Sequence, residues 1–123
     1  MMRLGVDLVA VDELDRLIER AWFVRYFFAD VEMAHADTLS GTRRREFLAG
    51  RFAAKEAVLK VLGVGIFDSV VPRDIVVERG SSGAPTVTLA DSAALAAQRV
   101  EIEQVNVSIS HKRELVAAVA AGW

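Results

Sequence analysis

A long helical pattern occupies the middle of the chain and constrains every fold that the rest can adopt. Ser40 or Thr42 can begin this helix, and Gly63 is of the type that commonly follows a last helical turn. Between them, apolar residues recur at helical spacing at Phe47, Leu48, Phe52, Leu59 and Leu62. The remaining elements are expected to pack around this one helix.

Strand and helix patterns follow one another on both sides of it. Strands are predicted over residues 4–11, 74–80, 85–90 and 104–110, with GSSGA joining the second and third as a hairpin. Shorter helices are predicted after Asp12 and over residues 91–100, with Asp12 and Asp91 as caps, whereas LVAAVAA fits a strand or a helix. Because the elements lack a regular strand–helix–strand alternation, we expect an α+β fold with the long helix packed on a mainly antiparallel sheet.

The composition is that of one domain, spanning residues 1–123, with a core of its own. Hydrophobic residues make up 53% of the chain, slightly above the usual share, which suggests further apolar surface buried in an oligomer. An aromatic cluster is predicted to belong to the core and contains Trp22, Phe23, Tyr26, Phe27 and Phe28.

Charge, cysteine content and hydropathy argue against several classes of protein. A net charge of −2 and a pI near 5.7 give no sign of nucleic-acid binding. The absence of cysteine excludes disulfides and thiolate chemistry. No apolar run approaches the roughly 18 residues of a membrane span, and Asp7 makes the N-terminal stretch a poor signal peptide. We therefore expect a soluble, cytoplasmic protein with neither a nucleic-acid nor a membrane partner.

One residue of the first predicted strand conflicts with its surroundings. The segment GVDLVAV places Asp7 within an aliphatic, β-branched run, although aspartate is depleted in strands. An ionised carboxylate in an apolar setting is costly unless it is paired or bound to a metal ion. A purely structural strand gains nothing from this carboxylate, so Asp7 is a candidate functional residue.

The long helix carries a second candidate pair within GRFAAKEAVLK. Glu56 and Lys60 lie one turn apart, which fits a surface salt bridge with its charges in the favourable order. The alternative interpretation is a metal-binding carboxylate beside a phosphate-binding lysine. Residues 43–60 contain six arginines and lysines against two glutamates, a local charge of +4, so this helix faces solvent or holds a polyanionic small molecule.

Two later features are ambiguous when taken alone. His111 lies at the end of a predicted strand, where a histidine is often incidental and sometimes functional. Gly83 and Pro85 fall in the segment SSGAP, which ordinary turn chemistry explains.

Four segments taken in order are similar to those of a known family: GVDLVAV, FLAGRFAAKEAVLKVLGVGI, DIVVERGSSGAP and VSISHKRELVAAV. Together they resemble the holo-acyl-carrier-protein synthases, the small trimeric class of 4′-phosphopantetheinyl transferases, over nearly the whole chain. The resemblance implies the phosphopantetheinyl-transferase fold. It also implies an enzyme that moves the phosphopantetheine arm of coenzyme A onto a serine of an apo acyl carrier protein, with Mg²⁺ as cofactor and adenosine 3′,5′-bisphosphate as the second product.

The same resemblance implies roles for individual residues. Asp7 and Glu56 match the carboxylates that hold Mg²⁺ against the pyrophosphate of coenzyme A, a ligand set that Mg²⁺ favours. Lys60 matches a lysine near those phosphates that assists the leaving group, and Glu56 is the candidate base for the serine proton, directly or through water. Contacts to the 3′-phosphate and to adenine are expected from Arg51, His111, Arg43, Gly83 and Pro85.

The resemblance further implies a cyclic homotrimer whose sites lie between subunits, with His111 supplied by the chain next to the one that supplies the carboxylates. A basic surface of Arg16 and residues 43–45 is expected to dock the acidic carrier protein. The chain departs from the family pattern at Glu13, Leu59 and Lys112, and these departures concern carrier docking rather than the metal site.

Two other classes of protein compete with the enzyme. A non-catalytic module that binds coenzyme A or a nucleotide predicts binding without a metal requirement and without a covalent product. A purely structural oligomeric domain predicts that neither ligand nor metal matters.

Overall fold

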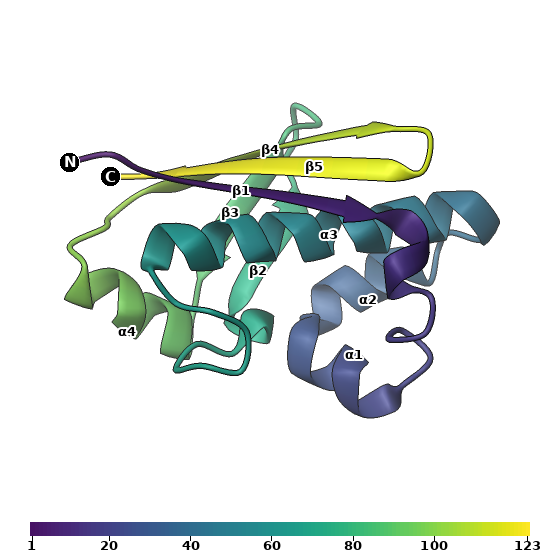
Figure 1. Ribbon diagram of the computed structural model, residues 1–123, viewed down its shortest axis with the longest axis horizontal. Coiled ribbons are helices and arrows are strands. Elements are labelled where there is room, and N and C mark those ends of the chain that lie inside the picture. The colour runs from purple at the N-terminus through teal and green to yellow at the C-terminus, as the bar shows by residue number, and fades with distance from the viewer.

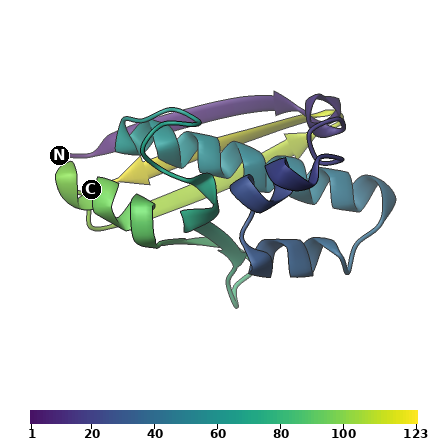
Figure 2. The same cartoon turned by 90° about the horizontal axis from the view of Figure 1, so that it is seen from below.

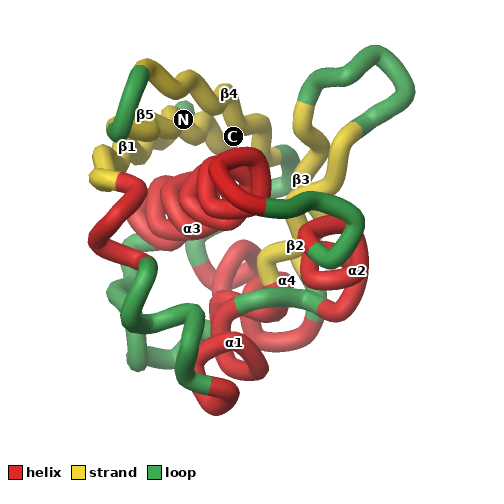
Figure 3. The backbone as a smooth tube through the Cα atoms, turned by 90° about the vertical axis from the view of Figure 1, so that its right-hand side faces the viewer, coloured by secondary structure: helices red, strands yellow, loops and turns green.

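The computed structural model describes residues 1–123 and places the long helix across one face of a three-stranded antiparallel sheet (Figure 1). The helix, α3, runs from Gly41 to Leu62, and the sheet contains β1 (Arg3–Ala10), β5 (Leu115–Gly122) and β4 (Val105–Lys112) in the order β1-β5-β4. Viewed from the end of α3, the sheet lies on one side of the helix and the shorter helices on the other (Figure 3). The expected α+β class is confirmed.

The other elements surround the rest of α3 (Figure 2). They include a hairpin of β2 (Ile75–Arg79) and β3 (Pro85–Leu89), which forms a second antiparallel sheet with β3 beside β4. The helices are α1 (Ala21–Phe27), α2 (Asp30–Ala36) and α4 (Asp91–Arg99), and the short 3-10 turns are η1 (Val11–Leu14) and η2 (Pro72–Asp74). None of the helices combines the length and apolar character that crossing a bilayer requires.

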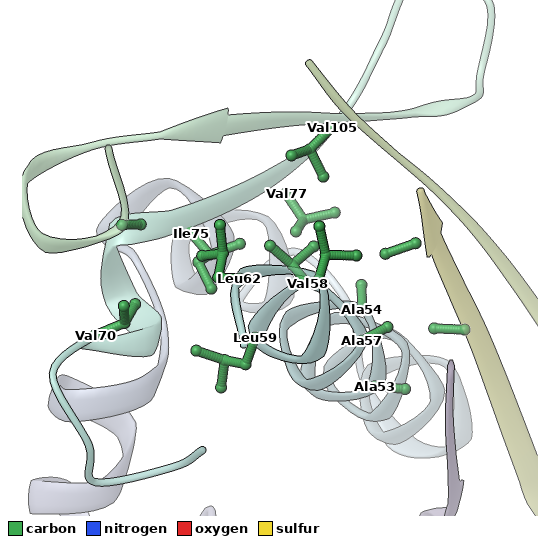
Figure 4. Close-up of a cluster of buried hydrophobic side chains, with 14 of the residues drawn as sticks. Ala53, Ala54, Ala57, Val58, Leu59, Leu62, Val70, Ile75, Val77 and Val105 are labelled. Atoms are coloured by element: carbon green, nitrogen blue, oxygen red, sulfur yellow. The ribbon is translucent and has the colours of Figure 1, made fainter. Parts of the chain in front are cut away.

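Small side chains on α3 allow the sheet to approach it closely. Ala53, Ala54 and Ala57 are fully buried within the cluster of valines and leucines that surrounds the helix (Figure 4). Gly63 ends the helix with a left-handed φ of 78°, as the sequence predicts.

The tightest approach is made by Gly5 of β1. A Cβ at this position would lie 2.0 Å from the carbonyl oxygen of Ala57, whereas a Cβ at Gly65 would meet no atom within 4 Å. Gly5 therefore sets the distance between β1 and α3 two residues before Asp7.

Gly5→Ala is expected to lower the free energy of unfolding by about 3 kcal/mol, because the added methyl group must push β1 off the backbone of α3. That change corresponds to a fall in Tm of roughly 10 °C for a chain of this size. Thermal denaturation of Gly5→Ala and of the control Gly65→Ala measures it. Equal Tm values for the two variants would contradict the close packing of β1 on α3.

The segment LVAAVAA, which fits either a strand or a helix by sequence, is the central strand β5. Its burial alternates with period two: Val116, Ala118 and Ala120 are buried, whereas Leu115 and Val119 are about half exposed. Pairing with β1 and β4 on both edges outweighs the helical preference of its alanines.

The predicted caps of the two short helices are wrong. The residues after Ala10 form only the 3-10 turn η1, and no side chain caps it. Asp91 is the first residue of α4, and the capping oxygen comes instead from Asp74, whose Oδ2 accepts a bond from the Ser92 N–H at 3.0 Å. A residue distant in sequence supplies this cap, so the local pattern could not show it.

Only part of the predicted aromatic cluster belongs to the core. Phe23, Phe27 and Phe28 are buried as predicted, whereas Trp22 is half exposed. Tyr26 stacks on the exposed ring of Phe67 at 5.1 Å between centroids. The five aromatic residues are thus divided between the core and the surface, because α1 has one face toward the core and the other toward solvent.

The outer face of the three-stranded sheet is apolar and exposed. In β1 the side chains of Leu4, Val6 and Leu8 are 60–67% exposed, and Val6 pairs directly with Val119 of β5. We name Leu4, Val6, Leu8, Leu115 and Val119 the outer-sheet patch. Within a single chain the apolar residues of β1 thus divide between two faces, since Val9 is buried and the other three face outward.

Candidate active site

Asp7 and Glu56 form a carboxylate pair where β1 crosses α3. Burial, together with the charge of Asp7, raises the pKa of Glu56 to about 6. Burial also raises the pKa of Asp7, against the opposing attraction of Lys60. The Oε1 atom of Glu56 is buried and has no hydrogen-bond partner in the protein. Two carboxylates are thus held together at a cost that a bound cation would remove.

Lys60 lies beside this pair. Its Nζ donates to the carbonyl oxygen of Val6 at 2.6 Å and lies 3.4 Å from Oδ1 of Asp7. The surface salt bridge between Glu56 and Lys60 that the spacing allows is therefore not formed, and Lys60 pairs with the strand carboxylate instead. Its side chain is half exposed, so the ammonium group is also open to a ligand.

The chemistry of the pair fits a hard divalent cation. Mg²⁺ is usually bound through one or two protein carboxylates, with substrate phosphates and water as its other ligands. The orphaned oxygen of Glu56 supplies one such ligand and Asp7 the other. No third histidine or acidic residue joins them, as expected for a site that a substrate completes. These residues fit the Mg²⁺ that the family resemblance implies.

Mg²⁺ is expected to raise the Tm of the wild-type protein but not that of Glu56→Gln. A carboxyl group whose folded pKa is raised binds more protons when folded, so the free energy of unfolding falls as pH rises from the reference value of 4.5 to about 6. Above that range the two charges destabilise the fold, and Mg²⁺ relieves them. Without metal at pH 7.5, Glu56→Gln should melt above wild type.

Glu19→Gln is the matched control, because Glu19 is exposed. It should keep both the wild-type Tm and the wild-type response to Mg²⁺. An equal Mg²⁺ effect on wild type and Glu56→Gln would place the cation elsewhere.

A second cluster surrounds a cavity of about 350 Å³ between α3, β4 and the turn that joins β2 to β3. Its lining contains Arg43, Arg51, Gly83, Pro85 and His111, which are all of the residues predicted to contact the 3′-phosphate and adenine. The fold thus brings residues that lie far apart in the sequence around one cavity. The positive charges of Arg43 and Arg51 suit an anionic ligand.

Arg51 is oriented toward this cavity by two contacts. Its Nε donates to the carbonyl oxygen of Val77 at 3.1 Å, and its guanidinium lies 4.3 Å from the centre of the Phe47 ring. Burial, together with the charge of Arg79, lowers the pKa of Arg51 against the opposing charge of Glu32. The terminal nitrogens of the guanidinium make no hydrogen bond within the protein and remain open to a ligand.

The lining of the cavity also contains three polar or charged residues that the sequence did not identify, namely Arg79, His35 and Glu46. Arg79 follows Val77 by two residues on β2, so strand alternation would have placed it on the same face. Glu46 lies beside His111, with 3.0 Å between Oε2 and Nε2. His35 comes from α2, and no local pattern connects it with β4.

The basic stretch of α3 does not present one positive face. Arg45 binds Asp15 through two bonds of 3.0 and 2.9 Å, Arg44 lies 3.6 Å from Asp37, and Lys55 is fully buried. Only part of the local charge therefore reaches the cavity, through Arg43 and Arg51.

The carboxylate pair and the cavity lie on different sides of α3 in one chain. Arg51 and Glu56 are five residues apart, which turns their side chains about 140° from one another around the helix. Asp7 and His111 lie on β1 and β4, which are the opposite edges of the sheet. A ligand that uses both clusters thus requires a second copy of the chain or a path around the helix.

Comparison with known proteins identifies relatives over the whole chain. Residues 3–120 match the 4′-phosphopantetheinyl transferase superfamily. The chain is 35% identical to a holo-(acyl-carrier-protein) synthase of Sulfurovum sp. over 122 residues, covering 98% of this chain and 95% of the relative.

Two solved structures share the fold and a comparable identity. One is a holo-(acyl-carrier-protein) synthase of Bacillus anthracis in complex with CoA (3′,5′-ADP), with a TM-score of 0.80, 31% identity, and coverage of 97% of this chain and 93% of that one. The other is the ACPS–CoA complex of Chronobacterium ammoniagenes, with a TM-score of 0.84, 30% identity, and coverage of 100% and 97%.

Proposed function

Because the chain belongs to the 4′-phosphopantetheinyl transferase superfamily, we propose that it is a holo-(acyl-carrier-protein) synthase. It transfers the 4′-phosphopantetheine arm of coenzyme A to a serine of an apo acyl carrier protein and releases adenosine 3′,5′-bisphosphate. The observation that carries this function is the orphaned carboxylate of Glu56 beside Asp7 and Lys60, where β1 and α3 of this fold meet. The expected cytoplasmic location goes with this proposal, since coenzyme A is an intracellular co-substrate.

Asp7 and Glu56 would hold Mg²⁺. When bound, the ion would neutralise the negative charge that develops on the pyrophosphate during phosphoryl transfer. Lys60 places an ammonium group beside the two carboxylates, where it offsets charge on the departing bisphosphate.

The serine hydroxyl must lose its proton as its oxygen bonds to the β-phosphorus. Glu56 is the proposed acceptor, directly or through a water molecule, because its buried Oε1 has no hydrogen-bond partner within the protein. The new oxygen–phosphorus bond replaces the one between the β-phosphorus and the bridging oxygen, which leaves with adenosine 3′,5′-bisphosphate.

The cavity on the other side of α3 is the proposed binding site for the adenosine end of coenzyme A. Arg51, Arg43 and His111 supply positive or hydrogen-bonding groups for the 3′-phosphate, with Gly83 and Pro85 beside the base. The relatives crystallised with CoA support this assignment of the co-substrate.

A homotrimer with sites between subunits is part of the same proposal. Two observations support it: the outer-sheet patch leaves apolar side chains in water, and the two site clusters lie apart within one chain. A head-to-tail ring covers the patch and brings the cavity of one chain to the carboxylates of its neighbour.

The carrier protein is proposed to dock beside the carboxylates. Arg16 is exposed, whereas Arg45 is bound to Asp15 and Arg44 is paired with Asp37. Arg16 is thus the freer of the predicted basic contacts on that surface.

The function is tested by following the release of adenosine 3′,5′-bisphosphate from coenzyme A. Release should require both an apo carrier protein and Mg²⁺, and EDTA should stop it. A protein that binds coenzyme A yet releases no bisphosphate under these conditions would be the non-catalytic module instead.

A further inference from the structure

An ion pair lies in the interior between α2 and α3, outside both site clusters. Lys55 is 0% exposed and Glu32 2% exposed, with 2.6 Å between Nζ and Oε1. The ammonium group also donates to the carbonyl oxygens of Pro72 at 3.0 Å and Ile75 at 2.6 Å, which uses all of its protons. This pair has no free group with which to bind a ligand.

The pair is attached to the edge of β2. This strand has a neighbour, β3, on one side only. Along an antiparallel strand the N–H and C=O groups of alternate residues point to the same edge. On the edge away from β3, Ile75 is bound by Lys55, and the N–H of Val77 donates to Oε2 of Glu32 at 2.8 Å.

Arg51 binds the next group on that edge. The carbonyl oxygen of Val77 accepts the bond from Nε of Arg51 at 3.1 Å. One residue of β2 thus has its N–H fixed by Glu32 and its C=O by Arg51. A smaller cavity of about 150 Å³ is lined by Glu32, Arg51, Val77 and Arg79. It shares both arginines with the cavity of about 350 Å³ that contains Arg43 and His111, which we name the anion cavity.

The three side chains therefore take the place of a neighbouring strand along β2. An apolar pair of the same volume fills such a space without net loss of protein stability. A protein with the apolar pair can even be more stable than one with the buried ion pair. It cannot, however, accept the Val77 N–H. The ion pair thus fixes the position of the Val77 backbone, which an apolar pair does not do.

We propose that the Glu32–Lys55 pair is a positioning element for the anion cavity. It holds the free edge of β2 so that Arg51 presents its guanidinium to a phosphate monoester of the ligand. That this phosphate is the 3′-phosphate of coenzyme A rests on the proposed function. The positioning of Arg51 then favours coenzyme A over dephospho-coenzyme A, which lacks that phosphate.

The test compares two uncharged double variants. Glu32→Leu/Lys55→Met removes the charges and the acceptor for Val77, whereas the control Glu32→Gln/Lys55→Met removes the charges and keeps an acceptor. The first should raise the KM for coenzyme A about tenfold and leave that for dephospho-coenzyme A within about twofold, and the control should restore most of the difference. In an Arg51→Ala background the first variant should add no further effect, because the lost contact is already absent.

A general loss of structure gives a different result. Equal changes in KM with both substrates, or effects that add to those of Arg51→Ala, would overturn the positioning role. If the leucine–methionine variant does not fold, Glu32→Asp replaces it, since the shorter side chain keeps the charge and cannot reach both Lys55 and Val77. An unchanged KM for coenzyme A in that variant would overturn the role as well.

The two proposals fail separately. Titration calorimetry with adenosine 3′,5′-bisphosphate measures the cavity without any turnover. Tighter binding by wild type than by the leucine–methionine variant supports the positioning role, and equal binding overturns it even in an active enzyme. A wild-type protein that forms no holo carrier protein overturns the function instead.

Discussion

Glu56→Gln is expected to lower transfer about a thousandfold, equivalent to about 4 kcal/mol of lost transition-state stabilisation, and Asp7→Asn should do the same. Each replacement keeps the size of the side chain and removes one of the two charges that would hold Mg²⁺. Glu56→Gln also removes the proposed base. Initial rates at saturating coenzyme A and carrier protein measure the loss.

The fold should survive both replacements. Burial raises the pKa of each carboxyl group, so neither charge stabilises the chain in the absence of metal. Circular dichroism and Tm at neutral pH check this, with Glu19→Gln as the control for a harmless change from glutamate to glutamine. Turnover by Glu56→Gln within tenfold of wild type would remove this carboxylate from the mechanism.

Val6→Lys is expected to separate the subunits and abolish transfer. Val6 is 60% exposed at the middle of the outer-sheet patch, and a lysine there places a charge into the proposed interface at each copy. The single chain should still fold, since this side chain contributes little to its core. Loss of activity follows because one chain alone keeps the cavity and the carboxylates on different sides of α3.

Sedimentation analysis gives the mass of the assembly for this variant and for a matched one. Leu95 on α4 is also apolar and 49% exposed but lies outside the patch, so Leu95→Lys should retain three chains and wild-type activity. A Val6→Lys protein that is a single chain and fully active would show that one chain contains the complete site.

One residue of the carboxylate site, Asp7, was predictable from its local pattern, whereas its pairing with Glu56 was implied by the family resemblance. Asp7 interrupts a strand, and Glu56 stands one turn before Lys60 on a helix that ends where the sequence predicts. Partner choice was less predictable. Lys60 pairs with Asp7 rather than with Glu56, since close packing at Gly5 brings β1 to the helix.

Two other features depend on contacts that sequence periodicity does not contain. An apolar strand pattern indicates that side chains are buried, but it does not show what covers them. Leu4 and Leu8 fit a core by their pattern, yet they face outward in the single chain. The ion pair of Lys55 with Glu32 joins two helices through the backbone of β2, and Lys55 looks like one more surface charge in the basic stretch. Contacts of this kind join residues that are far apart in the sequence, so only the folded structure identifies them.

The mass of the intact carrier protein tests the central claim most directly. An apo acyl carrier protein is incubated with coenzyme A, Mg²⁺ and the wild-type protein, and in parallel with Glu56→Gln, and then weighed by mass spectrometry. The account predicts a gain of one phosphopantetheine on the carrier with wild type and almost none with the variant in the same time. A carrier that keeps its apo mass with wild type, or gains the group equally with both proteins, would contradict it.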